Sequence, residues 1–138
     1  MTVKRAIGKG SEAEEALRNY FLSLGYFVVR GIPFVYNNIE ITDVDLWLYL
    51  KRTTHSRERV NIDIKRKKTP QAMERIFWTI GLKTALGCDK CIVATTDKRK
   101  ETREFGAKNG VTVLSGDFLE RTLQTYLIQP ERINEDDF

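Results

Sequence analysis

Two runs of alternating residues constrain this chain most, because each predicts a β-strand with one apolar and one polar face. The runs span residues 44–50 and 59–65. Side chains two residues apart share a face of a strand. Asp45 therefore lies opposite the leucines of the first run, and Asp63 and Lys65 lie opposite the valine and isoleucines of the second. If the two strands pair as a hairpin, carboxylates and a lysine gather on one face.

This polar face predicts a specific chemistry. Two carboxylates can hold a hard divalent cation, and a lysine beside them can serve a phosphate or a water, which is the equipment for metal-assisted phosphodiester hydrolysis. Taken singly, Asp63 with Lys65 would be an exposed ion pair and Asp45 a surface residue near a turn. Taken together, two acids on one face beside a basic loop repel each other unless a cation or lysine neutralises them, which favours a metal site. Asp43 shares the face of Asp45 and is the alternative main acid.

Length and composition indicate one soluble globular domain. The 138 residues are 41% hydrophobic and 30% charged, and they are enough to bury a core. The longest apolar stretches run about five residues, far short of a membrane span, and the N-terminus carries no secretory signal. We therefore expect a cytoplasmic protein with no membrane partner, a single domain over residues 1–130, and a loose acidic tail at 131–138.

Positive charge is concentrated next to the acids. The formal net charge is +4 and the pI is about 9.1, which mildly favours a polyanionic partner. Residues 51–68 hold eight basic residues: Lys51, Arg52, Arg57, Arg59, Lys65, Arg66, Lys67 and Lys68. Such a zone suits a phosphate backbone, although a solvated hairpin tip would have the same composition. Arg75, in the next helix, is a further phosphate contact or part of a solvated helix face.

Cys88 and Cys91 form a CxxC pair without the partners of a zinc site. A structural zinc ion needs four ligands, and the chain offers only these two cysteines and His55. We interpret the pair as small hydrophobic side chains.

The remaining pattern predicts a helix, a β-meander, and then helices alternating with strands. Helices are expected over 11–24, 70–86, from a cap at 95–97 to 108, and over 117–128, and strands over 26–30, 34–36, 41–50, 59–65, 91–94 and 111–114. Short apolar strands that alternate with helices favour parallel pairing by crossover connections. The predicted fold class is α/β, with a central mixed sheet of about five strands flanked by helices on both faces.

The first helix carries a further acid. Ser11 and Glu14 have the spacing of a capping box at the helix start. Ala13, Leu17, Phe21 and Leu24 form its apolar stripe, with Gly25 as the stop. Glu14 lies at the edge of this stripe, so it could face the polar site, cap the helix with Ser11, or pair with Arg18 four residues on.

Three features, in this order along the chain, resemble the PD-(D/E)xK, or restriction-endonuclease-like, nuclease superfamily. The first is the helix segment 10–17 with Leu24-Gly25-Tyr26. The second is Asp45 followed by Asp63-Ile64-Lys65, similar to the split D…(D/E)xK motif. The third is the strand 91–96, ending in Thr-Thr, with the segment 104–116. Within the superfamily the chain looks most like the Mrr-like and archaeal Holliday-junction-resolvase-like branch.

The resemblance implies a restriction-endonuclease-like core and a Mg²⁺-dependent DNA endonuclease in which Mn²⁺ substitutes. Asp45 would be the main metal ligand, Asp63 the second carboxylate ligand, and the carbonyl of Ile64 a third. Lys65 would orient or deprotonate the attacking water or neutralise charge on the phosphate. Glu14 would reach the metal directly or through water.

The resemblance also bears on partners. DNA is the expected substrate, and a homodimer is the default because cutting two strands or a junction usually needs two copies. The chain leaves little room for a separate recognition domain, so DNA shape, dimerisation or a partner protein would supply specificity. The alternatives are a non-catalytic nucleic-acid-binding module and a subunit of a larger DNA repair or defence complex.

Overall fold

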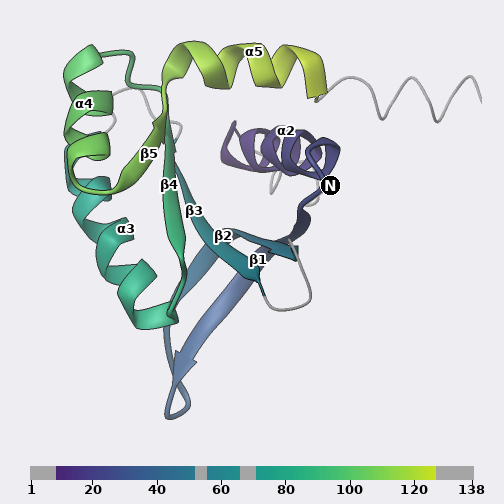
Figure 1. Ribbon diagram of the computed structural model, residues 1–138, viewed down its shortest axis with the longest axis vertical. Helices are drawn as coiled ribbons and strands as arrows, with labels where there is room; N and C mark the ends of the chain where they lie inside the picture. The colour runs from purple at the N-terminus through teal and green to yellow at the C-terminus, as the bar shows by residue number, and fades with distance from the viewer. Residues whose placement is uncertain (1–8, 52–55, 66–70, 127–138) are drawn as a thin grey trace, which may run out of the picture.

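A single five-stranded sheet organises the computed structural model, which describes residues 9–51, 56–65 and 71–126 (Figure 1). Its strands, in spatial and sequence order, are β1 (Phe27–Tyr36), β2 (Ile39–Lys51), β3 (Arg57–Lys65), β4 (Lys90–Thr95) and β5 (Val111–Leu114). The helices are α2 (Lys9–Ser23), α3 (Ala72–Leu86), α4 (Lys100–Lys108) and α5 (Gly116–Tyr126). Strands β1, β2 and β3 pair antiparallel, whereas β3, β4 and β5 pair parallel. The predicted α/β class with a mixed sheet is confirmed.

Helices cover both faces of the sheet. Helices α2 and α5 lie on one face, and α3 and α4 lie on the other (Figure 1). The first layer buries Leu17 and Phe21 of α2 against Leu46 and Ile62, and the second buries Ile76 of α3 against Val93. Strand β3 is therefore buried on both faces, which places its polar residues under α3.

The β1–β2 hairpin turns at two asparagines. Asn37 and Asn38 both adopt positive φ angles, 49° and 65°, as a two-residue turn of type I′ requires. Asparagine tolerates this left-handed conformation better than most residues. The register that starts at this turn shifts between Phe34 and Val35 before it reaches the part of β2 that holds Asp45.

Strand β1 corrects the prediction of two short strands at 26–30 and 34–36. The strand is continuous, and the register runs through Pro33, which pairs with Asp43. Gly31 within it adopts a φ of 60°. Because β1 is an edge strand, a proline there interrupts no ladder on a second side, so the sequence signal for a break was misleading.

Helix α2 begins earlier than predicted, which removes the capping box. It starts at Lys9, so Ser11 lies inside the helix rather than at its N-cap. The helix also ends at Ser23, so Leu24 lies in the turn that follows and is exposed, and its assignment to the apolar stripe was wrong. Ala13, Leu17 and Phe21 are buried as predicted.

Helix α4 also starts differently. Its N-cap is Arg99, with no side-chain cap, and not one of residues 95–97. Asp97 instead accepts hydrogen bonds from the backbone amide of Arg99, at 2.8 Å, and from the hydroxyl of Thr102, at 3.0 Å. The guanidinium of Arg99 beside it lowers the pKa of this carboxyl.

The cysteines are buried and form no disulfide. Burial raises the pKa of the Cys88 thiol to about 11 and also raises that of Cys91. A thiol with a raised pKa is a poor nucleophile and a poor metal ligand at neutral pH, in line with their interpretation as small hydrophobic side chains.

Several features predicted from sequence lie outside the described residues, among them the helix start at Pro70, the loop residue His55, and the tail at 131–138. Within the described part of the chain, no helix is both long and apolar enough to cross a membrane.

Candidate active site

The β2–β3 register brings the two predicted acids to one face of the sheet. Leu46 pairs with Ile62, so one further step along the antiparallel ladder sets Asp45 beside Asp63. Oδ2 of Asp45 accepts a hydrogen bond from the backbone amide of Ile64, at 2.8 Å. The carboxylate of Asp45 is therefore held at the point where regular β2–β3 pairing ends.

Asp63 is the buried member of the pair, and Arg75 of α3 holds it. Nε of Arg75 donates to Oδ2 of Asp63 at 2.9 Å, and a terminal guanidinium nitrogen donates to Oδ1. This bidentate contact matches the planar guanidinium to the planar carboxylate. The predicted phosphate-binding arginine is thus an ion-pair partner of the predicted metal ligand.

The charge environment of Asp45 shows that the predicted residues converge. Burial, mainly, raises the pKa of Asp45 to about 6. The negative charges of Asp63 and Glu14 raise it as well, whereas the Ile64 hydrogen bond and the positive charge of Lys65 lower it. Four predicted site residues therefore lie close enough to Asp45 to change its ionisation.

The geometry favours Asp45 over Asp43 as the main acid. Asp43 is exposed and pairs across the hairpin with Pro33. Asp45 is half-buried, bonded to the Ile64 amide and coupled to Asp63. Only Asp45 sits next to the other acid of the motif.

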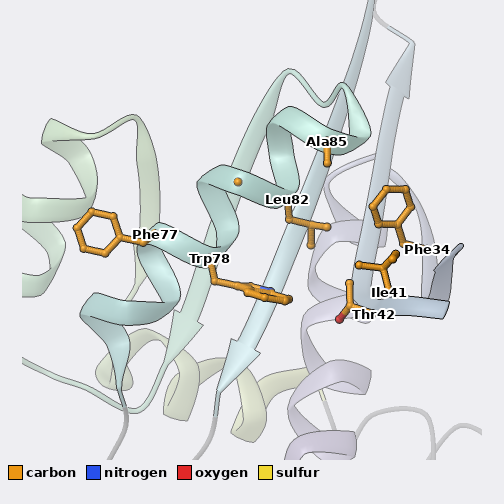
Figure 2. Close-up of a pocket in the computed structure, with 8 residues that line it drawn as sticks. Phe34, Ile41, Thr42, Phe77, Trp78, Leu82 and Ala85 are labelled. Carbon is orange, nitrogen blue, oxygen red and sulfur yellow. The ribbon is translucent and has the colours of Figure 1, made fainter. Parts of the chain in front are cut away.

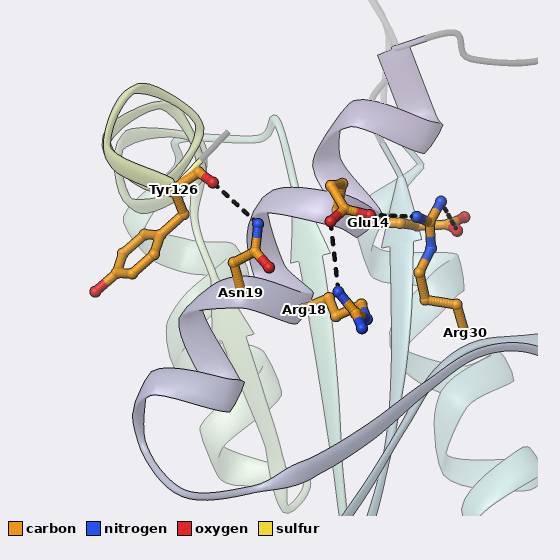
Figure 3. Close-up of polar contacts among 6 residues, drawn as sticks. Glu14, Arg18, Asn19, Arg30 and Tyr126 are labelled. Atoms are coloured by element: carbon orange, nitrogen blue, oxygen red, sulfur yellow. Dashed lines mark hydrogen bonds and ion pairs between the residues drawn. The ribbon is translucent and has the colours of Figure 1, made fainter. Parts of the chain in front are cut away.

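Glu14 contacts an arginine of β1 and not Arg18. Its Oε1 accepts from Arg30 at 3.3 Å, and the same guanidinium binds Oε1 of Glu15 at 2.6 Å (Figure 3). Arg18 pairs with Glu15 instead, at 3.5 Å. Glu14 therefore serves neither the predicted capping box nor the predicted helix pair, and it lies at the edge of the acid site.

Helix α2 is fixed in place by α5 from the far end of the chain. Nδ2 of Asn19 donates to the carbonyl of Tyr126 at 3.0 Å (Figure 3). Tyr20 also packs edge-to-face against Phe118 and Tyr126, with ring centroids 5.3 and 5.5 Å apart. These contacts determine where Glu14 stands relative to the strands.

The predicted basic residues are spread along the molecule. Lys51 and Arg57 lie opposite each other in the backbone ladder of the β2–β3 hairpin, at the end remote from Asp63. Arg57 and Asp63 are six residues apart in β3, roughly 20 Å at the rise of a strand. Arg52, Arg66, Lys67 and Lys68 lie outside the described residues. A phosphate chain would therefore have to follow the hairpin to meet both the acids and Lys51.

Sequence reasoning missed several neighbours of the site. Arg30 and Trp78 were not singled out, yet Arg30 binds Glu14, and the Arg75 guanidinium lies 5.1 Å from the centroid of the Trp78 ring. The three-residue spacing of Arg75 and Trp78 on a helix was the available signal. Asn61, two residues before Asp63, is fully buried, and its side-chain amide finds no hydrogen-bond partner among the described residues.

The carboxylates of the site are of the type that binds Mg²⁺, but arginines already bind two of them. Carboxylate oxygens are the protein ligands that Mg²⁺ prefers. Among residues 9–51, 56–65 and 71–126, however, no three His, Cys, Asp or Glu side chains are grouped so that they could hold a metal ion. Arg75 and Arg30 hold Asp63 and Glu14. A cation at Asp45 would relieve the repulsion between the acids, provided that Asp63 is released from Arg75.

An apolar groove of about 320 Å³ lies beside the site, between α3 and the tip half of the β1–β2 hairpin. Phe34, Ile41 and Thr42 face Trp78 and Leu82 across it (Figure 2). None of the described residues that line it is charged. The groove also exposes the ring of Trp78, which lies against Arg75.

Comparisons with known proteins inform on the fold. No protein-family model matches this chain, and no curated protein matches it. A solved structure described as "Crystal Structure of Protein of Unknown Function AF1548" is similar, with a TM-score of 0.61 and 14% sequence identity. The match covers 92% of this chain and 71% of that one. At this identity the likeness concerns the fold alone.

Proposed function

We propose that this protein is a Mg²⁺-dependent DNA endonuclease that hydrolyses phosphodiester bonds at Asp45, Asp63 and Lys65. One observation carries the proposal. The β2–β3 ladder ends at Leu46 and Ile62, so the next residues, Asp45 and Asp63, bring two carboxylates to one end of the ladder, and Lys65 lies two residues beyond Asp63. Acids brought together in this way raise the free energy of the fold, and a cation that bridges them would remove that cost.

The residues divide the chemistry among themselves. Asp45 and Asp63 would bind Mg²⁺, which supplies Lewis-acid stabilisation of charge on the phosphate when it is bound. The carbonyl of Ile64 and the carboxylate of Glu14 would complete the ligand set. Lys65 would hold or deprotonate the attacking water and stabilise the developing charge. Water attack in line would leave a 3′-hydroxyl and a 5′-phosphate, as the resemblance to PD-(D/E)xK nucleases implies.

DNA is the substrate that the charge distribution favours. The net charge is +4, and Lys51 and Arg57 lie at the end of the β2–β3 hairpin remote from the acid site. Residues 52 and 66–68 add four basic side chains to the sequence of the same region. Phosphate contacts of this kind give affinity without sequence preference, so DNA shape or a partner protein would select the target. We also propose a homodimer in the cytoplasm as the working form.

The order of motifs supports assignment to the restriction-endonuclease-like superfamily. Asp45 precedes β3, and Asp63, Ile64 and Lys65 end it, as in the split D…(D/E)xK pattern that the chain resembles. The α/β fold with a mixed sheet, which AF1548 shares, accommodates this assignment.

A plasmid assay tests the proposal. Supercoiled plasmid and branched DNA are incubated with the protein in Mg²⁺, in Mn²⁺ and in EDTA. The proposal predicts nicking in both metals, none in EDTA, and a loss of at least about 100-fold for Asp45→Asn and Lys65→Met. Asp43→Asn, an exposed acid on the same strand, is the matched control and should cleave normally.

The second candidate is a non-catalytic nucleic-acid-binding module. It is favoured by the two arginines, Arg75 and Arg30, that already neutralise Asp63 and Glu14. Tight DNA binding with no cleavage in any divalent metal would establish the module and overturn the nuclease. Cleavage that persists equally in Asp45→Asn would show that the activity comes from another protein in the sample.

A further inference from the structure

The carboxylate of Asp63 binds Arg75, and under the proposed function it would also bind a metal ion. Both of its oxygens accept from Arg75, with Nε at 2.9 Å from Oδ2. A divalent ion bound by Asp63 would take one of these oxygens at about 2.1 Å. A guanidinium and Mg²⁺ held on one carboxylate would lie a few ångströms apart, and their mutual repulsion disfavours joint occupancy.

The two partners differ in how freely they can move. The side chain of Asp63 is 7% exposed and that of Arg75 is 23% exposed. Asp63 lies on a central strand that is paired on both sides, so its backbone is fixed. Arg75 lies in the first turns of α3 and reaches its partner through a long, flexible side chain. The arginine is therefore the group that can leave.

The ring of Trp78 lies next to the guanidinium of Arg75 and can report its position. The guanidinium of Arg75 lies 5.1 Å from the centre of the Trp78 ring, within the range of a cation–π contact. The ring is 44% exposed and lines the apolar groove shown in Figure 2. Its fluorescence should respond when the cation over it moves.

We propose that Arg75 and a divalent metal ion occupy the Asp63 carboxylate in turn, so that Arg75 holds the metal-free site and is expelled from Asp63 as the metal binds. This inference rests on the function proposed above. It assigns Arg75 to the regulation of metal entry. Asp63 then always has a cationic partner, either the guanidinium or the metal.

Two measurements without DNA test the exchange. The first is calorimetric titration of the full chain, Arg75→Gln and Arg75→Lys with Mg²⁺. The exchange predicts that Arg75→Gln binds Mg²⁺ about tenfold more tightly than the natural chain, because no competitor must be displaced. Arg75→Lys keeps the charge but loses the two-pronged contact, so it should bind a few-fold more tightly. A pure net-charge effect would leave Arg75→Lys equal to the natural chain.

The second measurement reads the arginine directly. Trp47→Phe leaves Trp78 as the sole tryptophan of the chain. Added Mg²⁺ should then change the emission of Trp78 with the same midpoint as the calorimetric titration. In Trp47→Phe/Arg75→Gln the change should disappear, because no guanidinium lies over the ring. This reporter keeps Arg75 in place, so it applies even where Arg75→Gln folds poorly.

The outcomes separate the inference from the function beneath it. If Mg²⁺ binds all three proteins equally and Trp78 does not respond, the metal site stands and the exchange is wrong. If Mg²⁺ binds none of them, the proposed metal site fails and the exchange fails with it. Tighter binding in both variants, together with a Trp78 response that requires Arg75, establishes the exchange.

Discussion

At the scale of single residues, the fold disfavours the charged form of Asp45. Its pKa is raised to about 6, chiefly by burial. The unfolded chain releases this proton near pH 4, so between pH 4 and pH 6 the folded state binds more protons than the unfolded state. The contribution of Asp45 to stability therefore falls as the pH rises through this window, and the full cost is present above pH 6.

Replacing this acid by its neutral isostere should stabilise the protein. Asp45→Asn keeps an oxygen that can accept from the Ile64 amide and removes the buried charge. We expect the free energy of unfolding to rise by about 2 to 3 kcal/mol at pH 8 and to be unchanged below pH 4. Urea denaturation at the two pH values measures this. Asp43→Asn should change nothing at either pH, and an equal gain from Asp43→Asn would contradict the account.

Removing Arg75 from its pair with Asp63 should lower the stability of the protein, whereas Asp45→Asn should raise it. Arg75→Ala leaves a buried carboxylate without its partner, and we expect a loss of about 3 kcal/mol at pH 7. Arg18→Ala is the matched control, since its pair with Glu15 is 3.5 Å long and more accessible to solvent than the Asp63–Arg75 pair, and its loss should cost less than about 0.5 kcal/mol. Thermal melts of both variants give the comparison. A similar loss in the two would mean that Asp63 is well solvated.

The site could be predicted only in part from the sequence. The two-residue period of a strand was enough to put Asp63 and Lys65 on one face, because that property is local. The arginines were not predictable in their role, because Arg75 meets Asp63 across 12 residues and Arg30 meets Glu14 across 16. Contacts at such separations in the sequence depend on how α2 and α3 pack on the sheet, and no local sequence pattern predicts that packing.

At the scale of helices and strands, the stops were predicted better than the starts. Gly87 and Gly110 follow α3 and α4 with φ angles of 71° and 76°, the left-handed conformation that glycine favours. The start of α4 was misplaced because Asp97, a good capping residue by type, is bound to Arg99 and Thr102 instead. The continuity of β1 through Pro33 depends on its place at the sheet edge, which is a tertiary property.

Two helix glycines offer a direct test of how the helices pack. A methyl group at Gly106 of α4 would collide with the Val113 side chain and lie 3.0 Å from the Val111 carbonyl oxygen. At Gly81 of α3 the same methyl group meets nothing within 4 Å. Gly106→Ala should cost about 1 to 3 kcal/mol, whereas Gly81→Ala should stabilise by about 0.5 to 1 kcal/mol. Chemical denaturation measures both, and equal signs would show that α4 is not packed on β5 as described.

At the scale of the whole molecule, the charge layout predicts how DNA binding depends on salt. If the duplex follows the hairpin from Asp63 to its remote end, Lys51→Gln and Arg57→Gln should each reduce the slope of log affinity against log salt by about 0.9. Binding is measured in Ca²⁺ to limit cleavage.

The control for this prediction is a lysine after β4 that acidic side chains already neutralise. Lys98 pairs with Asp117 and Glu120 near the start of α5. Lys98→Gln should leave the salt slope unchanged. A slope that changes equally in all three variants would place the DNA elsewhere than along the hairpin.

The long outer strand of the sheet raises a hazard that its own sequence reduces. β1 has ten residues, and its free edge could template pairing with another chain and so seed aggregates. Pro33 has no amide hydrogen, and Gly31 departs from extended geometry at a φ of 60°, so the edge offers an interrupted row of donors. The irregularity that misled strand prediction thus acts as a gatekeeper, and it should help to keep the protein dispersed at high concentration.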